Sequence, residues 1–259
     1  MAGTRTSKRA PPRWTPPARG ASRPCRRRSQ KSARRTRFCG LTTRRSKKPP
    51  ASRIFPARTR SPRFAAARTC FDMRIVGGAF RGRTIAAPKG SSTRPTADGA
   101  REALFNVLAH RDDFSFEGAR VIDLFAGSGA LGLEAMSRGA AWCLFVETDA
   151  AARGAIRDNV ETLGLFGATR IHRRSATSLG DKPAGVGAPF TLAFLDPPYA
   201  MDLCAPCLDV LRAGRWLADA ALVVVEQGER EAPAEAQGFV EEDRRRWGAA
   251  QVGIYRFGG

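Results

Sequence analysis

Apolar and polar positions after residue 72 follow two periods that alternate along the chain. Short apolar runs typical of buried strands precede turns, and the turns precede segments in which apolar residues recur every three or four positions. The runs predict strands at residues 120–125, 141–147, 169–172, 191–195 and 221–226. The helical spacing predicts helices at residues 97–108, 130–138, 150–163 and 203–211. This alternation predicts an α/β fold with a mostly parallel sheet and helices on both faces.

Two further segments predict antiparallel hairpins at the ends of this pattern. Residues 74–86 contain glycines and several arginines, which predict a short β-hairpin that carries positive charge. Residues 239–246 and 251–257 are separated by a Trp-Gly turn and predict a C-terminal antiparallel hairpin. The expected fold is therefore a Rossmann-like sheet with an N-terminal β-hairpin extension and a C-terminal hairpin. Ligands of such sheets bind at the carboxyl ends of the strands.

Charge divides the chain at residue 72. The sequence has 44 Lys and Arg against 24 Asp and Glu, a formal net charge of +20 over 259 residues. Residues 1–72 carry 22 of the basic residues and a single acid, Asp72, whereas residues 73–259 carry 22 basic and 23 acidic residues. The second part is nearly neutral and rich in Leu, Val, Ile, Phe and Ala. It can close a core, which excludes a histone-like basic binder and a disordered chain.

Residues 1–72 consist largely of Arg, Pro, Ser, Thr and Ala, without helical or strand periodicity. We expect a disordered basic tail ahead of one domain at residues 73–259. Three interpretations remain open: an electrostatic RNA-binding arm, an organelle transit peptide, or an upstream extension without a role in the fold. Met73 opens the first patterned segment, which favours the third interpretation.

Apolar runs and cysteines bear on the location of the protein. No run approaches the roughly 18 apolar residues of a membrane helix, so we expect a soluble protein without a membrane partner. Six cysteines show no paired framework of the kind that small secreted domains use, which favours a reducing compartment. We expect a cytoplasmic location in a bacterium, with organelle targeting by residues 1–72 as the less favoured alternative. Cys204-Ala-Pro-Cys207 has C-x-x-C spacing but lacks a second pair and a nearby His. We therefore expect core cysteines and no metal site.

A glycine-rich segment, Asp-Leu-Phe-Ala-Gly-Ser-Gly-Ala-Leu-Gly at residues 123–132, joins a predicted strand to a predicted helix. Gly127, Gly129 and Gly132 match G-x-G-x-x-G, which permits a tight turn and a close approach of the backbone to a ligand. Glu147 ends the next predicted strand, where a carboxylate can accept hydrogen bonds from ribose hydroxyls. These features alone fit either a dinucleotide or S-adenosylmethionine.

Asp123 distinguishes between these two ligands. A carboxylate at the end of the first strand repels a pyrophosphate but attracts the ammonium group of S-adenosylmethionine. We therefore expect S-adenosylmethionine as the cofactor. A larger side chain at Gly129 should then block the ligand while it leaves the fold nearly intact.

A second motif, Asp196-Pro197-Pro198-Tyr199, follows the predicted buried strand at residues 191–195. The two prolines restrict φ and remove two N–H donors, which leaves carbonyl oxygens in fixed positions. The Asp196 carboxylate and the Pro197 carbonyl can accept hydrogen bonds from an exocyclic amine, while the Tyr199 ring stacks on a planar base. Such bonds direct the nitrogen lone pair towards a methyl carbon, and Asp196 is a candidate proton acceptor.

These motifs together resemble the amino-methyltransferases that use S-adenosylmethionine. The arginine-rich hairpin at residues 73–83, the Arg-Pro-Thr loop at residues 94–96, Asp98 and the segment at residues 101–106 are similar to the RsmD family. The resemblance covers residues 73–259 and implies a Rossmann-like class I methyltransferase fold. It also implies methyl transfer to N2 of a guanine in 16S ribosomal RNA. The implied partner of the monomeric enzyme is this RNA or the small ribosomal subunit.

The motifs and the resemblance assign three groups of site residues. The catalytic group is Asp196, Pro197, Pro198 and Tyr199. The cofactor-binding group is Asp123, Phe125, Gly127, Ser128, Gly129, Gly132, Glu147 and Thr148. The RNA-binding group is Arg74, Arg81, Arg83, Arg94 and Arg101. Two positions depart from the family pattern, because Gly99 replaces a larger residue and residues 173–176 lack an Asp that related enzymes place near the adenine.

Three other functions are compatible with parts of the sequence. An adenine-N6 methyltransferase acting on DNA or RNA would use the same pocket. A nicotinamide-dependent oxidoreductase would use the glycine loop and Glu147, but Asp123 disfavours it and residues 196–199 would have no role. A non-catalytic basic RNA-binding protein would depend on residues 1–72.

Overall fold

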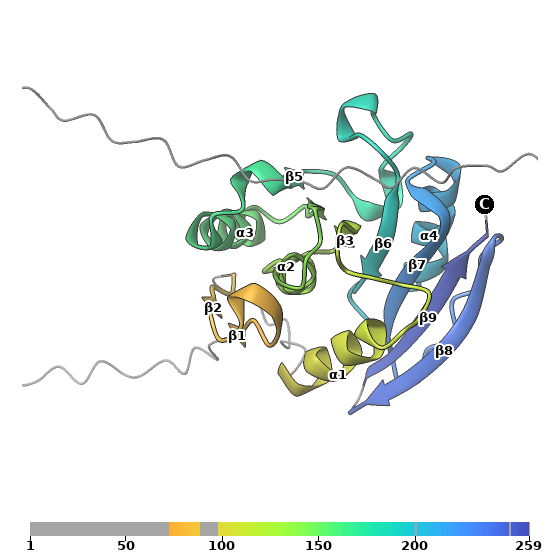
Figure 1. The fold of residues 1–259 in the computed structure, drawn as a ribbon. Helices are drawn as coiled ribbons and strands as arrows, with labels where there is room; N and C mark the ends of the chain where they lie inside the picture. The colour runs from red at the N-terminus through yellow and green to blue at the C-terminus, as the bar shows by residue number, and fades with distance from the viewer. Residues whose placement is uncertain (1–72, 89–97, 200, 249, 259) are drawn as a thin grey trace, which may run out of the picture. The chain divides into compact units, whose positions relative to one another are not determined.

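The computed structural model describes residues 73–88, 98–199, 201–248 and 250–258 (Figure 1). The expected tail at residues 1–72 lies outside the described residues, as does Arg94. The domain boundary expected at residue 72 therefore stays a prediction.

Seven strands of the described chain form one sheet in the spatial order β5-β4-β3-β6-β7-β9-β8 (Figure 1). The strands are β3 Arg120–Leu124, β4 Trp142–Val146, β5 Thr169–His172, β6 Phe190–Leu195, β7 Leu217–Gly228, β8 Phe239–Trp247 and β9 Ala250–Phe257. Strands β3 to β7 pair in parallel, whereas β9 and β8 are antiparallel. The predicted sheet and C-terminal hairpin are confirmed. The chain leaves β3 towards β4 and later returns to β6 on its other side, which creates the switch point where ligands bind.

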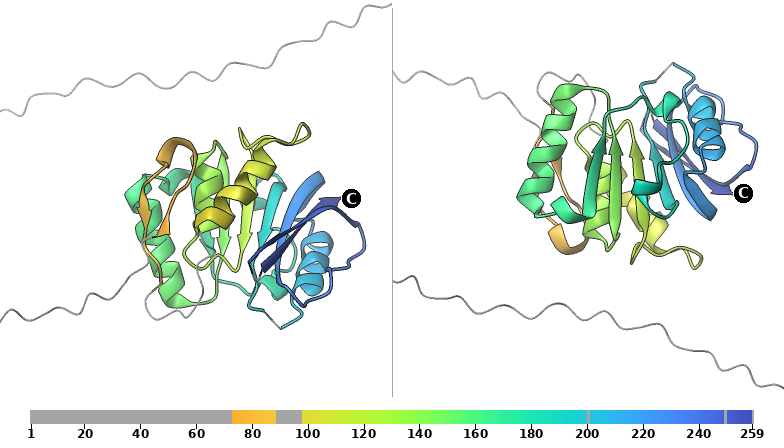
Figure 2. Two further views of the ribbon diagram at one scale, coloured as in Figure 1. Left: turned by 90° about the horizontal axis from the view of Figure 1, so that it is seen from below. Right: turned by 90° about the horizontal axis from the view of Figure 1, so that it is seen from above.

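Helices cover both faces of this sheet, as predicted. The described helices are α1 Asp98–Ala109, α2 Ala130–Ser137, α3 Ala150–Leu163, α4 Cys204–Ala213 and the 3-10 helices η1 Gly78–Phe80, η2 Phe166–Ala168, η3 Ala176–Ser178 and η4 Ala184–Val186. Helices α1 to α3 share a core with one face, and α4 shares a core with the other (Figure 2). Alternate strand residues face alternate cores, as Val121 and Ile122 do. No described helix is long and apolar enough to cross a membrane.

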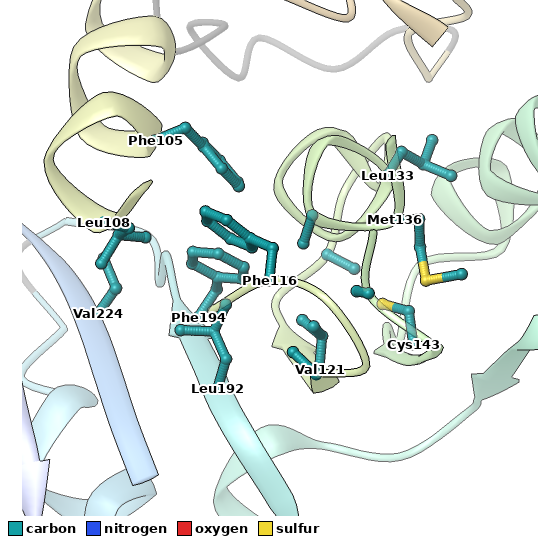
Figure 3. Packing of buried hydrophobic residues seen from close by; sticks show 14 of the residues in the cluster. Phe105, Leu108, Phe116, Val121, Leu133, Met136, Cys143, Leu192, Phe194 and Val224 are labelled. Carbon is teal, nitrogen blue, oxygen red and sulfur yellow. The ribbon is translucent and has the colours of Figure 1, made fainter. Parts of the chain in front are cut away.

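Aromatic rings fix α1 against β6, the strand that leads into the Asp-Pro-Pro-Tyr motif (Figure 3). Phe105 of α1 stacks on Phe116, with ring centroids 5.4 Å apart. Phe105 also contacts Phe194 of β6, with centroids 5.5 Å apart. Burial of one such side chain stabilises the fold by about 1.5–3 kcal/mol. The rings therefore hold α1 firmly over the sheet.

The predicted N-terminal hairpin is present and is attached to α2 by hydrogen bonds. Strand β1 (Met73–Arg74) pairs antiparallel with β2 (Thr84–Ile85). Glu134 of α2 is buried and accepts a hydrogen bond from Val76 N at 2.8 Å. Ser137 Oγ accepts another from Phe80 N at 2.9 Å. These bonds make the hairpin a part of the domain and not a loose extension.

Strand β7 is longer at both ends than the predicted strand at residues 221–226. Its first residues break the apolar pattern, because Asp219 and Ala220 are exposed and Ala220 has a φ of +59°. The pairing of β7 with β6 also shifts in register there. Such an irregularity interrupts the alternation of side chains, so periodicity alone does not detect this part of the strand.

Candidate functional site

Acidic residues gather where four neighbouring strands end. They are Asp123 in β3, Glu147 after β4, Asp196 after β6 and Glu226 in β7. Strand β3 pairs in parallel with both β4 and β6, and β6 pairs in parallel with β7. The carboxyl ends of these strands therefore meet at one edge of the sheet, where α/β proteins bind their ligands.

The glycine loop between β3 and α2 has the conformation that its glycines predict. Gly127 and Gly129 have φ values of +55° and +79°, in the region that favours glycine, and Gly129 is the N-cap of α2. Phe125 also has a positive φ, +61°, which marks a constrained turn directly after β3. The loop leads into the N-terminus of α2, which favours anionic groups of a ligand.

Close packing restricts side chains in this loop. A Cβ atom on Gly132 would overlap the Phe145 ring and lie 2.7 Å from Cys143 Sγ. A Cβ on Gly129 would lie 3.1 Å from Phe145 Cε1, whereas a Cβ on Gly127 would meet no atom nearer than 3.9 Å. The expectation that a larger residue at Gly129 leaves the fold nearly intact is therefore wrong. Its positive φ and the Phe145 ring both oppose a side chain there.

Asp123 lies beneath the glycine loop. It is 1% exposed, and its Oδ2 accepts a hydrogen bond from Gly132 N at 2.9 Å. Burial raises the pKa of Asp123 well above its usual range against the effect of this bond, and the charges of Asp196 and Glu147 raise it further. This burial corrects the expected direct contact with a ligand ammonium group. Asp123 instead stabilises the loop through its hydrogen bond to Gly132 N.

Glu147 connects the end of β4 to the same loop. Its Oε2 accepts a hydrogen bond from Gly127 N at 2.9 Å, and its Oε1 accepts one from Asp149 N at 2.8 Å. The neighbouring Thr148 is exposed, whereas Ser128 of the loop is buried. The structure thus brings the predicted cofactor residues together at the ends of β3 and β4.

Asp196 follows β6 and lies beside the end of β7. Leu195 pairs with Val225, so Asp196 and Glu226 occupy the next position on two adjacent strands. Burial raises the pKa of the Asp196 carboxyl group to about 8, and the negative charge of Glu226 contributes to this increase. A carboxyl group with such a pKa exchanges its proton near neutral pH, as general bases and acids do.

The Pro-Pro turn carries Tyr199 to the surface of this pair. Pro197 is buried, whereas Pro198 is exposed and Tyr199 is 46% exposed. Tyr199 Oη donates a hydrogen bond to Glu226 Oε1 at 2.7 Å. Burial raises the pKa of the Tyr199 hydroxyl, and the bond to Glu226 raises it further, so the hydroxyl remains a donor. Glu226 holds the hydroxyl end of the Tyr199 ring, while part of the ring surface stays exposed to solvent.

Comparisons with known proteins identify relatives of the described domain. The family model described as conserved hypothetical protein 95 matches residues 73–256. Ribosomal RNA small subunit methyltransferase D of Escherichia coli is 40% identical over 154 residues, which cover 60% of this chain and 74% of that protein. The chain belongs to the RsmD family.

Two further matches to this RsmD-family chain cover nearly the whole length of the other protein. A putative rRNA methyltransferase of Bacillus subtilis is 35% identical over 185 residues, which cover 71% of this chain and 98% of that protein. The structure of a putative methyltransferase from Escherichia coli aligns with a TM-score of 0.62 and 34% identity, over 72% of this chain and 98% of that chain. The resemblance expected from the hairpin and the two motifs is confirmed.

The arginines that we expected to bind RNA fall into two groups in this RsmD-family chain. Arg74, Arg81 and Arg83 are exposed on the N-terminal hairpin. Arg101 is 1% exposed, and its Nη2 donates hydrogen bonds to Asp98 Oδ1 at 2.7 Å and to the Arg74 carbonyl. Its burial leaves no surface for a phosphate, so the structure corrects the expectation for Arg101. This residue attaches α1 to the hairpin.

The C-x-x-C cysteines are core residues, as predicted. Cys204 and Cys207 lie at the start of α4 and are both buried. Burial raises the pKa of each thiol to about 12, which disfavours a thiolate nucleophile. Over the described ranges, no group of three or more His, Cys, Asp or Glu side chains could hold a metal ion.

Glu226 is a site residue of this RsmD-family chain that the sequence analysis missed. It is 8% exposed and ends the predicted strand at residues 221–226. An acid at the end of an apolar run was the signal that singled out Asp123 and Glu147. The same signal applied to this run would have identified Glu226, but its bond to Tyr199 depends on tertiary structure.

Proposed function

We propose that the protein transfers a methyl group from S-adenosylmethionine to the exocyclic N2 amine of a guanine in 16S ribosomal RNA of the small subunit. Family membership supports ribosomal RNA methylation, because a relative that is 40% identical is named for it. The observation that carries the choice of guanine is the pair of neighbouring carboxyl groups, Asp196 and Glu226, beside the ring of Tyr199.

The glycine loop and its surroundings fit S-adenosylmethionine. A Cβ on Gly127 would meet no atom nearer than 3.9 Å, so a ligand can approach the backbone on that side. The carboxylate of Glu147 would receive ribose hydroxyls, and the N-terminus of α2 favours the ligand carboxylate. When bound, S-adenosylmethionine supplies an electrophilic methyl group on a positively charged sulfur. The carboxyl groups at this edge of the sheet favour that positive charge.

The acceptor pocket complements the Watson–Crick edge of guanine. That edge presents the N1–H and N2–H donors side by side, whereas adenine presents the N1 acceptor next to its N6 donors. Ionised carboxylates only accept hydrogen bonds, so Asp196 and Glu226 suit two adjacent donors. The Pro197 carbonyl is a third acceptor, and the partly exposed Tyr199 ring can stack on the base.

The exocyclic amine is a poor nucleophile because its lone pair is delocalised into the ring. Hydrogen bonds from N2 to Asp196 and to the Pro197 carbonyl hold the nitrogen so that its lone pair faces the methyl group. As the nitrogen forms its bond to carbon, it releases one N–H proton, which the Asp196 carboxylate accepts. A pKa of about 8 makes Asp196 a stronger base than an ordinary carboxylate. The reaction needs no covalent enzyme intermediate.

Exposed arginines on the N-terminal hairpin supply the RNA contacts in this proposal. Arg74, Arg81 and Arg83 would neutralise phosphates, which positions an RNA without reading its sequence. The target guanine must leave its base stack to reach Asp196, so it should lie in a loop or another unpaired region. The protein would act as a monomer in the cytoplasm.

Adenine-N6 methylation is the second candidate, and the protonation of Asp196 favours it. With a pKa of about 8, Asp196 carries a proton in most of the molecules at neutral pH. A protonated carboxyl group offers one donor and one acceptor, which would match N1 and N6 of adenine. The two candidates differ in the modified nucleoside that they produce.

Methylation mapping tests the proposal. Small ribosomal subunits and naked 16S RNA from an Escherichia coli strain that lacks its own methyltransferase D are incubated with the protein and methyl-labelled S-adenosylmethionine. The RNA is then digested to nucleosides. The expected product is N2-methylguanosine. N6-methyladenosine as the only product would support the second candidate, and unlabelled RNA in both preparations would contradict both.

A calorimetric titration separates these candidates from an oxidoreductase. S-adenosylhomocysteine, the product of the cofactor, and NAD are titrated separately into the protein. Heat with S-adenosylhomocysteine alone is expected. Heat with NAD alone would contradict the methyltransferase assignment.

A further inference from the structure

We propose that Glu226 is the positioning residue of the acceptor pocket: it holds the ring of Tyr199 in place and supplies, beside Asp196, a second negative charge that orients the guanine. This role rests on the proposed function, since it presumes a guanine in the pocket. No motif marks Glu226, and it lies 27 residues after Tyr199 in the chain.

The register of β6 and β7 places the two carboxyl groups beside each other. Leu195 and Val225 pair with each other and both belong to the core beneath α4. Side chains alternate along a strand, so Glu226, which follows Val225 within β7, points towards the opposite face, and Asp196 directly follows the last residue of β6. Helix α1 covers that face. The two groups therefore share a site because of strand pairing and not because of proximity in sequence.

The hydroxyl group of Tyr199 fixes the orientation of its ring. The hydrogen bond from Tyr199 Oη to Glu226 Oε1 is 2.7 Å long, and Glu226 is only 8% exposed, so the acceptor is fixed within the domain. Among the described residues, no aromatic ring stacks on Tyr199. The bond to Glu226 is therefore well placed to hold the ring at the angle that a stacked base requires.

The hydrogen bond alone does not require a carboxylate. A glutamine at position 226 would accept the same bond from Tyr199 through its amide oxygen. Glu226 instead brings a negative charge next to Asp196, and like charges in a buried site are costly. A cost of this kind concentrates at functional sites. Besides holding Tyr199, the Glu226 charge acts on Asp196, whose pKa it raises.

The surroundings assign the electrostatic effect on Asp196 to Glu226. The ionisable groups that interact with Asp196 or with its neighbours are Asp123 of β3, Tyr199 and Asp202 after β6, Cys204 of α4, Glu226 of β7 and Glu231 after β7. After burial, the charge of Glu226 is the cause that raises the pKa of Asp196. Removal of this charge should therefore make Asp196 ionise at lower pH.

Kinetics of full-length variants test both roles. The variants are Glu226→Gln, Glu226→Leu, Tyr199→Phe and the double variant Tyr199→Phe with Glu226→Leu. Methylation of the RNA described above is measured at saturating S-adenosylmethionine and at a series of pH values around the pKa of Asp196. The kcat and the KM for RNA are determined separately for each variant.

Glu226→Gln should separate charge from positioning. It keeps an acceptor for Tyr199 but removes the charge that orients the guanine, so the KM for RNA should rise less than it does in Glu226→Leu. The midpoint of the rising limb of kcat against pH should shift down by about one unit, the interaction at which two sites titrate as a pair. Glu226→Leu and Tyr199→Phe should each raise KM about fivefold or more. The KM of the double variant should be no higher than that of the more affected single variant, because the two substitutions remove the same hydrogen bond.

An unchanged pH profile for Glu226→Gln, or fully additive effects on KM in the double variant, would overturn the proposal. Glu229→Gln is the matched control, because Glu229 is exposed nearby and its change should leave both kinetics and pH profile unaltered. Thermal melts report folding, and Glu226→Gln should melt no lower than the parent. If Glu226→Leu unfolds, the Gln and Phe variants still decide the outcome.

The parental protein separates this proposal from the proposed function. If the parent produces no methylguanosine, the proposed function itself is wrong. If the parent methylates guanine and Glu226→Gln behaves identically in rate, KM and pH profile, only the role of Glu226 is wrong.

Discussion

The cofactor half and the acceptor half of the site differ in what their carboxyl groups contact. In the cofactor half, Asp123 and Glu147 accept hydrogen bonds from backbone N–H groups of the glycine loop. In the acceptor half, Asp196 and Glu226 lie side by side, and burial and repulsion raise the pKa of Asp196 to about 8. The first pair shapes the backbone, whereas the second pair lies where the proposed reaction places the base.

This difference indicates which substitutions should act through the fold and which should act through the reaction. A carboxyl group that accepts backbone N–H bonds holds the loop in one conformation, although burial raises the pKa of Asp123 as it raises that of Asp196. Two carboxyl groups that repel each other reduce stability but remain reactive. Changes in the cofactor half should therefore weaken the fold and ligand binding together. Changes in the acceptor half should lower the rate while they preserve or raise stability.

Asp196→Ala should have the largest effect on the methylation rate, and it should impair the acceptor half without affecting the cofactor half. Loss of the carboxyl group removes an acceptor for the amine and its proton, so the rate should fall about 100-fold or more. The affinity for S-adenosylhomocysteine, measured by calorimetry, should stay nearly unchanged. Asp202→Asn is the matched control, because Asp202 is exposed six positions later. Methylation at the parental rate by Asp196→Ala would contradict the mechanism. Loss of methylation in Cys204→Ser would contradict it as well.

Gly132→Ala should impair the cofactor half by destabilising the packing around the glycine loop. Its Cβ would overlap the Phe145 ring and crowd Cys143 Sγ, so the free energy of unfolding should fall by about 1–3 kcal/mol and the loop should lose cofactor affinity. Gly127→Ala is the control, because no atom lies within 3.9 Å of that position and only its positive φ opposes the change. Thermal melts and calorimetry compare the two. Equal melting temperatures would show that packing at Gly132 does not matter.

The pH dependence of stability should sharpen the comparison. The pKa of Asp196 is raised from 3.8 to about 8, so the folded protein binds this proton more tightly than the unfolded chain does. Its contribution to stability is present below about pH 4 and is lost as the pH rises through 8. Asp196→Asn should therefore stabilise the protein above pH 8 by at least about 1 kcal/mol, or about 2–4 °C in Tm. The gain should vanish in acid, and a gain independent of pH would contradict this assignment.

The smallest effect should come from the hairpin arginines. Arg81→Ala combined with Arg83→Ala should weaken RNA binding and reduce the slope of log affinity against log salt by about 1.5, since each lost phosphate contact contributes about 0.7–0.9. Cofactor affinity should not change. Arg215→Ala is the control, because Arg215 is exposed directly ahead of β7 and is not part of the hairpin. A salt slope equal to that of the parent would exclude these contacts.

Sequence patterns predicted the backbone of the glycine loop, but not the burial of Asp123 beneath it or the partner of Tyr199. The glycine loop is one continuous segment, so its turn, its positive φ values and its position after β3 follow from neighbouring residues. The acceptor half combines the Asp-Pro-Pro-Tyr motif with Glu226, and these meet only because β6 pairs with β7. Local patterns identified the motif but not its partner.

The sequence by itself determined the order of strands and helices, the glycine turn, the charge division at residue 72 and the Asp-Pro-Pro-Tyr motif after β6. These features depend on periodicity, on glycine and proline geometry, and on residues close in the chain. The tertiary structure decided that Arg101 and Asp123 are buried, that β7 begins at Leu217, and that Glu226 accepts the hydroxyl of Tyr199. Burial and strand register arise from segments far apart in sequence, whose contacts form only when the sheet and its helices pack together.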